Sequence, residues 1–184
     1  VLIALIRGFV RREAGQIGNF WVDFTRSTLY VLLPLSFVLA VALASQGVVQ
    51  SFAPYRHATL VEPVVTQDRT VTEQTLPLGP AASQVAIKQL GTNGGGFFNV
   101  NSAHPFENPT PLSNFLEMLA ILLIPAALCY TFGSMVNDKR QGWALLAAML
   151  VIFVPLLIGA FAAEQAGNPR FDALGVDQAA SAMQ

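Results

Sequence analysis

Apolar positions concentrate in three runs of the chain, each near the length of a membrane span. The runs cover about residues 27–45, 112–136 and 143–163. A helix needs about 20 apolar residues to cross the roughly 30 Å hydrocarbon core of a bilayer. Because each run is apolar on every face, the pattern predicts three transmembrane helices rather than the one-sided helices of a soluble core.

Each of these runs contains one proline, namely Pro34, Pro125 and Pro155. In water such a residue would break a helix. In a bundle, neighbouring groups can satisfy the freed carbonyl, so the expected result is a kink rather than an end.

The long segment between the first two runs has two parts with different patterns. Residues 46–79 are rich in valine and threonine with scattered prolines, which predicts an extended loop or short strands. Residues 80–90 then have the pattern of a short helix, which the Gly79-Pro80 pair or Ser83 could begin. About ten helical residues reach only roughly 15 Å, so this helix can enter a membrane but cannot cross it.

A glycine-rich segment, Gly91-Thr92-Asn93-Gly94-Gly95-Gly96, ends the predicted short helix. Glycines permit positive φ angles and leave backbone carbonyls bare. At membrane depth such a backbone is tolerated only inside protein or beside a wet cavity, and carbonyl rings replace the hydration shell of potassium. The layout of helix, half-length helix, glycine loop and helix therefore predicts the filter of a cation pore.

The composition of the glycine segment also allows two other interpretations. A surface turn has the same composition and stays open as an alternative. A phosphate-binding loop is disfavoured because no Gly-Lys-Ser/Thr follows the glycines.

The polar stretch after the glycines supplies candidates for the outer mouth or for support of the filter. Phe97 and Phe98 can pack behind a loop that lacks side chains, and Glu107 could concentrate cations at the mouth. A turn or capping role competes for every polar residue in the stretch, and His104 before Pro105 fits a hydrogen-bonded turn better than a proton carrier. The candidates are Asn99, Asn101, His104, Glu107 and Asn108.

Two further residues lie inside the predicted spans. Glu117 is early in the second run, where a carboxylate is either functional or merely interfacial, and the sequence leaves both open. Cys129 is the single cysteine, lies in an apolar stretch and is interpreted as a buried side chain rather than a reactive thiol.

Composition agrees with a membrane protein and excludes several functions. The chain is 53% apolar and 11% charged, with a mean hydropathy of +0.52 and a net charge of −1. Soluble domains usually carry about 25% charged residues. The charge gives no support to nucleic-acid binding, and two histidines with one cysteine give no metal-ligand spacing. No catalytic residue and no organic cofactor are predicted.

The basic residues predict an orientation. Those before the first span and those in the 137–142 loop must share one side, and the positive-inside rule places them in the cytoplasm. Residues 46–111 and 164–184 are then outside, and residues 1–26 are the end of a preceding membrane helix plus a cytoplasmic linker. This opening indicates a fragment of a longer polypeptide. The basic residues are Arg7, Arg11, Arg12, Arg26, Lys139 and Arg140.

The run GTNGGGFFNVNSAHPFENPTPLSNFLEMLAILLIPAALCYTFG, residues 91–133, resembles the A subunit of the bacterial potassium-transporting Kdp ATPase. The resemblance continues through LPLGPAASQVAIKQ, NDKRQG and GNP, and so covers nearly the whole chain. It implies an all-α integral membrane fold of repeated helix, pore helix, filter loop and helix units, with an extracytoplasmic loop. Residues 27–136 would be the second repeat, and residues 143–163 the first helix of the third.

The resemblance also implies a function. Thr92, Asn93, Gly94, Gly95 and Gly96 would be one repeat's share of a potassium filter, and potassium would be the transported ion. A separate P-type catalytic subunit would hydrolyse ATP, and small accessory subunits would complete the complex in the bacterial inner membrane. One alternative is an independent channel-like potassium or sodium transporter of the same superfamily. Another, from a different class, is a non-transporting membrane scaffold.

Overall fold

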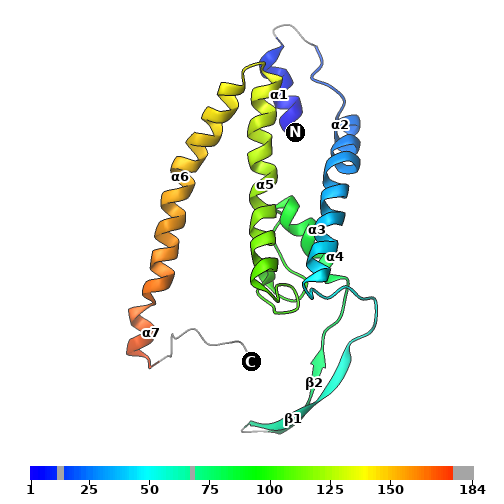
Figure 1. Ribbon diagram of the computed structural model, residues 1–184, viewed down its shortest axis with the longest axis vertical. Helices are drawn as coiled ribbons and strands as arrows, with labels where there is room; N and C mark the ends of the chain where they lie inside the picture. The colour runs from blue at the N-terminus through cyan, green and yellow to red at the C-terminus, as the bar shows by residue number, and fades with distance from the viewer. Residues whose placement is uncertain (12–14, 67–68, 176–184) are drawn as a thin grey trace. The chain divides into compact units, whose positions relative to one another are not determined.

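The computed structural model describes residues 1–11, 15–66 and 69–175 (Figure 1). Arg12, which was used to predict the orientation, and residues 176–184, which were predicted to lie outside, are not among the described residues. The chain divides into two compact units, Val1–Leu128 and Cys129–Gln184, which are described separately. The elements are α1 (Leu2–Val10), α2 (Phe20–Ser27), the π-helix η1 (Thr28–Leu32), α3 (Leu33–Ser45), β1 (Arg56–Thr66), β2 (Arg69–Leu76), α4 (Ala81–Gly91), the 3-10 helix η2 (Val100–Ser102), α5 (Pro111–Met135), α6 (Lys139–Ala166) and α7 (Pro169–Ala173).

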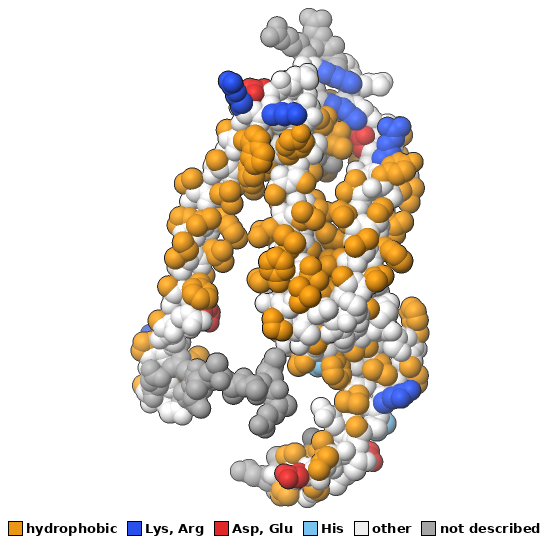
Figure 2. Space-filling model, viewed as in Figure 1, with side chains coloured by type: hydrophobic (Ala, Val, Ile, Leu, Met, Phe, Trp, Pro, Cys, Tyr) orange, Lys and Arg blue, Asp and Glu red, His pale blue; other side chains and the backbone are white. Residues whose placement is uncertain are grey.

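Three helices are long and apolar enough to cross a membrane, which confirms the three predicted spans. They are Phe20–Ser45 with 26 residues, Pro111–Met135 with 25 and Lys139–Phe171 with 33. Their apolar side chains are largely exposed, and Figure 2 shows them covering the surfaces of α3 and of α6. Exposed apolar surface of this extent is typical of helices that face lipid or other membrane helices.

Two of these helices begin earlier than the hydropathy predicts, because polar caps rather than apolar runs set the first turn. The first begins at Phe20 instead of residue 27, where the Asn19 side chain accepts the Val22 amide at 3.3 Å. The third begins at Lys139 instead of residue 143, where Asp138 accepts the Arg140 amide at 3.0 Å. Such caps satisfy amides that the first helical turn leaves without partners.

The proline of the first span is accommodated by a π-helical turn. In η1 the chain is wound more loosely, and the Leu33 amide donates to the Thr28 carbonyl, one residue further back than in an α-helix. Pro34 follows directly, at the start of α3. A proline ring in a regular helix would clash with the carbonyl four residues earlier, and the wider turn relieves that clash. Pro125 and Pro155 lie inside continuous helices, α5 and α6.

Residues between α3 and α4 form a β-hairpin, so the expectation of an all-α fold is wrong for this segment. β1 and β2 pair antiparallel, with His57 opposite Thr75 and Val65 opposite Thr70, and a register shift interrupts the ladder between Thr59 and Val64. The cause is the density of β-branched valine and threonine, which pack well on a pleated surface. Of the two forms predicted here, short strands are the one observed.

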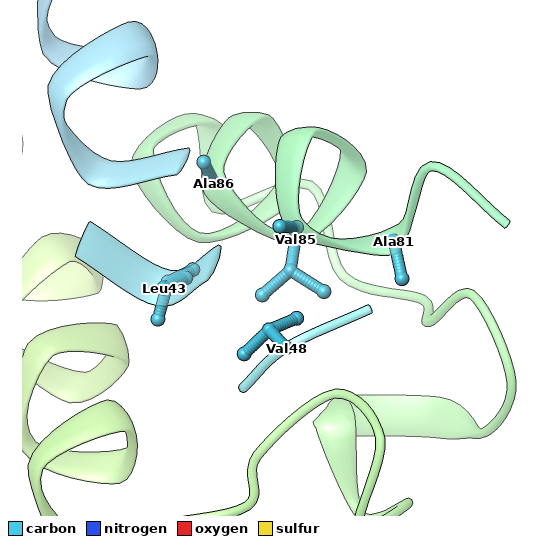
Figure 3. Packing of buried hydrophobic residues seen from close by; sticks show 6 residues of the cluster. Leu43, Val48, Ala81, Val85 and Ala86 are labelled. Atoms are coloured by element: carbon cyan, nitrogen blue, oxygen red, sulfur yellow. The ribbon is translucent and has the colours of Figure 1, made fainter. Parts of the chain in front are cut away.

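The first half of α4 packs against the end of α3 and the chain that follows it. Ala82, Val85 and Ala86 are buried against Leu43 and Val48 (Figure 3). Alanine side chains allow this close approach, and the Ala82 amide donates to the Val49 carbonyl at 2.9 Å. These contacts hold the start of α4 beside the end of the first span. The glycine segment follows at the other end of α4.

In the second unit, the end of α5 and the start of α6 approach closely through two glycines. A Cβ atom on Gly142 would lie 2.6 Å from the carbonyl oxygen of Cys129, and one on Gly133 would lie 3.0 Å from Gly142. Asn137 makes the turn between the helices with φ 59°. Small residues at such crossings let membrane helices pack backbone to backbone.

Cys129 is buried and unpaired, as the sequence predicted, and its Sγ lies 3.6 Å from the Sδ of Met149. We expect Cys129→Ser to be nearly silent, costing about 1 kcal/mol or less, because a helical serine can bond the carbonyl four residues back. Potassium uptake and the thermal midpoint of the purified full-length protein measure this, with Cys129→Ala as the control without a hydroxyl. Loss of uptake in both variants would contradict a purely packing role.

Candidate cation site

The chain that follows α4 adopts the left-handed backbone conformation, which glycine adopts more easily than other residues. α4 ends at Gly91, and its cap Thr92 is left-handed with φ 51°. Gly94 and Gly95 follow with φ 72° and 84°. Left-handed backbone is costly for most side chains, so the glycines here meet a conformational requirement. The segment Thr92–Gly95 is exposed in this chain.

Most carbonyls of this segment are available as ligands. Over residues 69–175, the carbonyls of Thr92, Asn93 and Gly94 accept no hydrogen bond from another group. The Gly95 carbonyl differs, because it accepts the amide of Asn101 at 3.1 Å and is held toward the following loop. Bare carbonyl oxygens are the groups that coordinate a dehydrated monovalent cation.

The space around the glycines also differs along the segment. A Cβ atom on Gly94 or Gly95 would meet nothing within 4 Å, so both positions border open space. A Cβ on Gly96 would overlap the backbone carbonyl of Asn99. The first two glycines therefore face outward, and the third is enclosed by the returning chain.

The C-terminal end of α4 lies beside the second turn of α5. The Gln89 amide donates to Glu117 Oε2 at 2.7 Å. Glu117 is in the second turn of α5, about 9 Å from its start at 1.5 Å per residue. It is only 3% exposed, so its carboxylate is enclosed by protein, and both the functional and the interfacial interpretation stay open.

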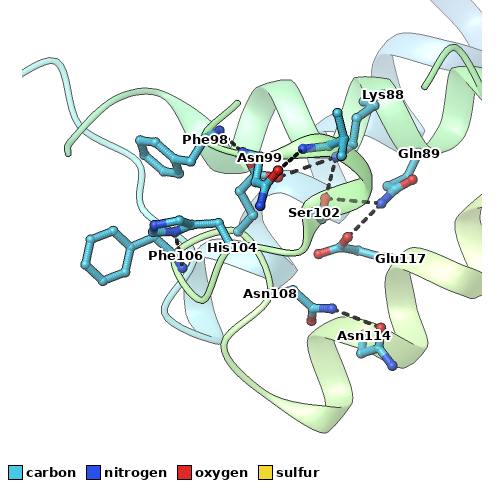
Figure 4. Close-up of polar contacts among 12 residues, drawn as sticks. Lys88, Gln89, Phe98, Asn99, Ser102, His104, Phe106, Asn108, Asn114 and Glu117 are labelled. Atoms are coloured by element: carbon cyan, nitrogen blue, oxygen red, sulfur yellow. Dashed lines mark hydrogen bonds and ion pairs between the residues drawn. The ribbon is translucent and has the colours of Figure 1, made fainter. Parts of the chain in front are cut away.

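Behind the glycine segment lies a buried polar network centred on Lys88 (Figure 4). The Lys88 ammonium donates to Ser102 Oγ and lies 3.5 Å from Glu107 Oε2, with the two charged side chains 2% and 0% exposed. Gln89 contacts the same serine at 3.4 Å. An ion pair so completely buried requires excellent geometry and further hydrogen bonds to offset its desolvation.

Glu107 supplies those further hydrogen bonds to the loop that follows the glycines. Its Oε1 accepts the amide of Phe98 and the amide of Asn99, the latter at 3.3 Å. Burial alone would raise the pKa of Glu107, but these two amides and the Lys88 ammonium hold it below its ordinary value. Glu107 is therefore a buried carboxylate whose lowered pKa favours the ionised form, and its predicted role at an outer mouth stays a prediction.

The other mouth candidates are mostly turn residues. Asn99 accepts the amide of Val100 at 2.8 Å, and Asn101 is left-handed with φ 55°. His104 Nδ1 accepts the Phe106 amide at 3.1 Å. Asn108 binds Asn114 and Ser113 at 2.9 and 2.7 Å, near the start of α5.

Aromatic rings flank this loop on the side of α3. The Phe98 ring contacts Phe97, His104 and Phe106 at centroid distances of 4.8, 5.1 and 6.2 Å. Phe98 also packs against the buried cluster of α3 and α4. The aromatic pair after the glycines thus anchors the returning chain to the hydrophobic core.

Sequence reasoning missed Lys88, Gln89 and Ser102 as members of the site. One signal was available, because a lysine inside a helix expected to enter the membrane must have a buried partner. The sequence did not identify which carboxylate would pair with it. Among the described residues, no group of three or more His, Cys, Asp or Glu side chains is arranged to hold a metal ion.

Comparison with known proteins gives one consistent match. The potassium-transporting ATPase A subunit family matches residues 1–184. Proteins named potassium-transporting ATPase potassium-binding subunit are 68% identical in Herpetosiphon aurantiacus and 69% in Sorangium cellulosum, each over 185 aligned residues covering 100% of this chain and 32% of the relative. The Methylococcus capsulatus protein is 64% identical and is covered to 34%. The chain therefore spans about a third of the length of these relatives.

Proposed function

The chain belongs to the potassium-transporting ATPase A subunit family, and we propose that it carries one of the filter segments with which such a subunit binds and selects potassium. The observation that supports this most lies in the glycine segment, where the Thr92, Asn93 and Gly94 carbonyls are free and Gly94 and Gly95 border open space. In this proposal α4 is the pore helix and residues 27–136 form one pore repeat.

The chemistry of the proposed site is dehydration followed by carbonyl coordination. Potassium loses its water shell only where oxygen ligands of comparable strength replace it. Thr92, Asn93 and Gly94 offer such oxygens, and the C-terminal end of α4 adds the negative end of a helix dipole. One segment provides only part of a ring, so the remaining ligands come from other repeats of the longer polypeptide.

We further propose that the subunit works within a pump. ATP hydrolysis belongs to a P-type catalytic partner, and small accessory subunits complete the assembly in the bacterial inner membrane. The positive-inside rule places in the cytoplasm the basic residues that precede or begin the first span and those in the first turn of α6. The hairpin and the glycine segment are then reached from outside, where potassium is captured.

Two alternatives make different demands. A channel-like potassium or sodium transporter of the same superfamily would use the same filter without a partner ATPase. A membrane scaffold would keep the glycine segment as a surface turn, and the contact of Gln89 with Glu117 within α5 argues against that position.

Potassium uptake tests the proposal in cells that lack their own potassium systems. The full-length parent protein is expressed with and without the partner subunits, and growth and uptake are measured at low external potassium. Uptake that requires the catalytic partner is the expected result. Uptake without any ATPase would establish the channel-like transporter, and no uptake in either strain, with the protein present in the membrane, would favour the scaffold.

A further inference from the structure

The Lys88–Glu107 pair connects the two ends of the glycine segment. Lys88 is in the last turn of α4, three residues before Gly91, and Glu107 is in the loop that leads to α5. Their charged groups lie 3.5 Å apart with both side chains almost fully buried. Neither charged group reaches solvent, so each interacts only with the protein groups that it contacts.

What these charges contact is the backbone that leaves the glycines. Glu107 accepts the amides of Phe98 and Asn99, the second and third residues after Gly96. Lys88 binds Ser102, which is left-handed with φ 55°. The residue before it, Asn101, donates its amide to the Gly95 carbonyl at 3.1 Å. The ion pair is therefore linked to the Gly95 carbonyl through two adjacent residues, Ser102 and Asn101.

We propose that Lys88 and Glu107 are positioning residues that fix the spacing of the carbonyls in Thr92–Gly96 and thereby set the cation size that the filter accepts. This rests on the proposed function of the same segment. The three glycines of that segment have no side chains with which to hold its shape, and Gly94 and Gly95 border open space. The conformation of the segment must therefore be held by the buried residues beside it. Hydrogen bonds to an ionised carboxylate suit this purpose, because they are about twice as strong as neutral ones.

Glu117 has a different place in the network. It contacts the pore-helix residue Gln89, not the loop amides, and one of its carboxylate oxygens, Oε1, is buried without a partner. Glu117 thus joins α4 to α5, and its interaction with the loop is with the Ser102 side chain rather than with the amides that Glu107 accepts. The proposal assigns the control of carbonyl spacing to Lys88 and Glu107 alone.

The test uses the full-length subunit in its complete complex, reconstituted in lipid vesicles, with potassium and rubidium transported separately. Glu107→Gln keeps an oxygen for the Phe98 and Asn99 amides but removes the charge opposite Lys88. The ratio of the rubidium KM to the potassium KM is expected to fall by at least about threefold, since hydrogen bonds to charged groups are the stronger class. Glu73→Gln, an exposed carboxylate on β2, is the matched control and is expected to leave the ratio unchanged.

Two more variants separate positioning from folding. Lys88→Gln combined with Glu107→Gln restores a neutral pair, and its ratio is expected to lie closer to wild type than that of either single variant. Glu107→Asp keeps the charge but shortens the reach to the amides, so it is expected to shift the ratio even if Glu107→Gln fails to assemble.

Two outcomes decide the proposal. If the pair variants lower only the amount of protein or kcat, or change both KM values by one factor, the pair is structural and the proposal is overturned. Gly94→Asp, measured alongside, distinguishes failure of the filter itself. A ratio that Gly94→Asp does not move removes the proposed function, whereas a ratio moved by Gly94→Asp and not by the pair variants removes only this inference.

Discussion

Gly94→Asp and Gly95→Asp are expected to abolish selective potassium uptake at low external potassium, raising the KM for potassium by about tenfold or more. Both glycines have positive φ, at 72° and 84°, and a side chain at either would project into open space. A carboxylate there would enter the ion site as a full charge, where carbonyl dipoles otherwise coordinate the ion. Any monovalent cation satisfies a carboxylate, so discrimination falls, and the intruding side chain displaces carbonyl ligands, so the affinity for potassium falls as well.

The matched control for this charge is Gly94→Asn. Asparagine has nearly the shape of aspartate and tolerates the left-handed region, so it adds the same bulk and strain without the charge. We expect Gly94→Asn to weaken uptake less and to preserve more of the preference over sodium. Uptake and competition by sodium measure both variants, and unchanged potassium affinity in both aspartate variants would count heavily against a filter at 92–96.

The spans were predictable because the bilayer imposes one strong rule on the sequence. About 20 consecutive apolar residues have few other uses, so hydropathy alone located the three long helices. Their starts were not predictable to the same degree. Asn19 and Asp138 are polar residues outside the apolar runs, and only the hydrogen bonds they accept reveal that the helices begin there.

The polar network was less accessible to sequence reasoning, because pairing between distant residues leaves no local pattern. Lys88 and Glu107 are 19 positions apart, and the sequence suggested a place for Glu107 at an outer mouth without relating it to Lys88. In the structure the loop folds back on α4, with Phe98 packed on the α3–α4 cluster and Glu107 beside Lys88. A sequence can supply the hypothesis of a buried partner for Lys88, while the fold decides its identity.

The same contrast applies to the glycines, which look alike in the sequence and differ in the structure. The triplet permits positive φ and bare carbonyls at all three positions. Gly94 and Gly95 have positive φ and border open space, whereas Gly96 is packed against the carbonyl of Asn99. This contact comes from the return of the chain after the glycines, where Glu107 accepts the amides of Phe98 and Asn99.

Gly96→Ala is therefore expected to be far more damaging than Gly94→Ala, although both add one methyl group. At Gly96 the methyl would overlap a backbone carbonyl that Glu107 holds in place, so the loop cannot simply yield. Overpacking of this kind costs about 1–3 kcal/mol and more where backbone must move. At Gly94 the methyl meets open space, and only the left-handed strain of about 1–2 kcal/mol applies.

Thermal midpoints and potassium uptake of the full-length complex separate the two costs. We expect Gly96→Ala to lower the midpoint and abolish uptake, because the displaced Asn99 backbone also loses its bond to Glu107. Gly94→Ala is expected to keep a midpoint near wild type and to weaken uptake in proportion to the strain. Equal midpoints for both variants would mean that the return after Gly96 is not held, and the carbonyl spacing would then have to be fixed from elsewhere in the subunit.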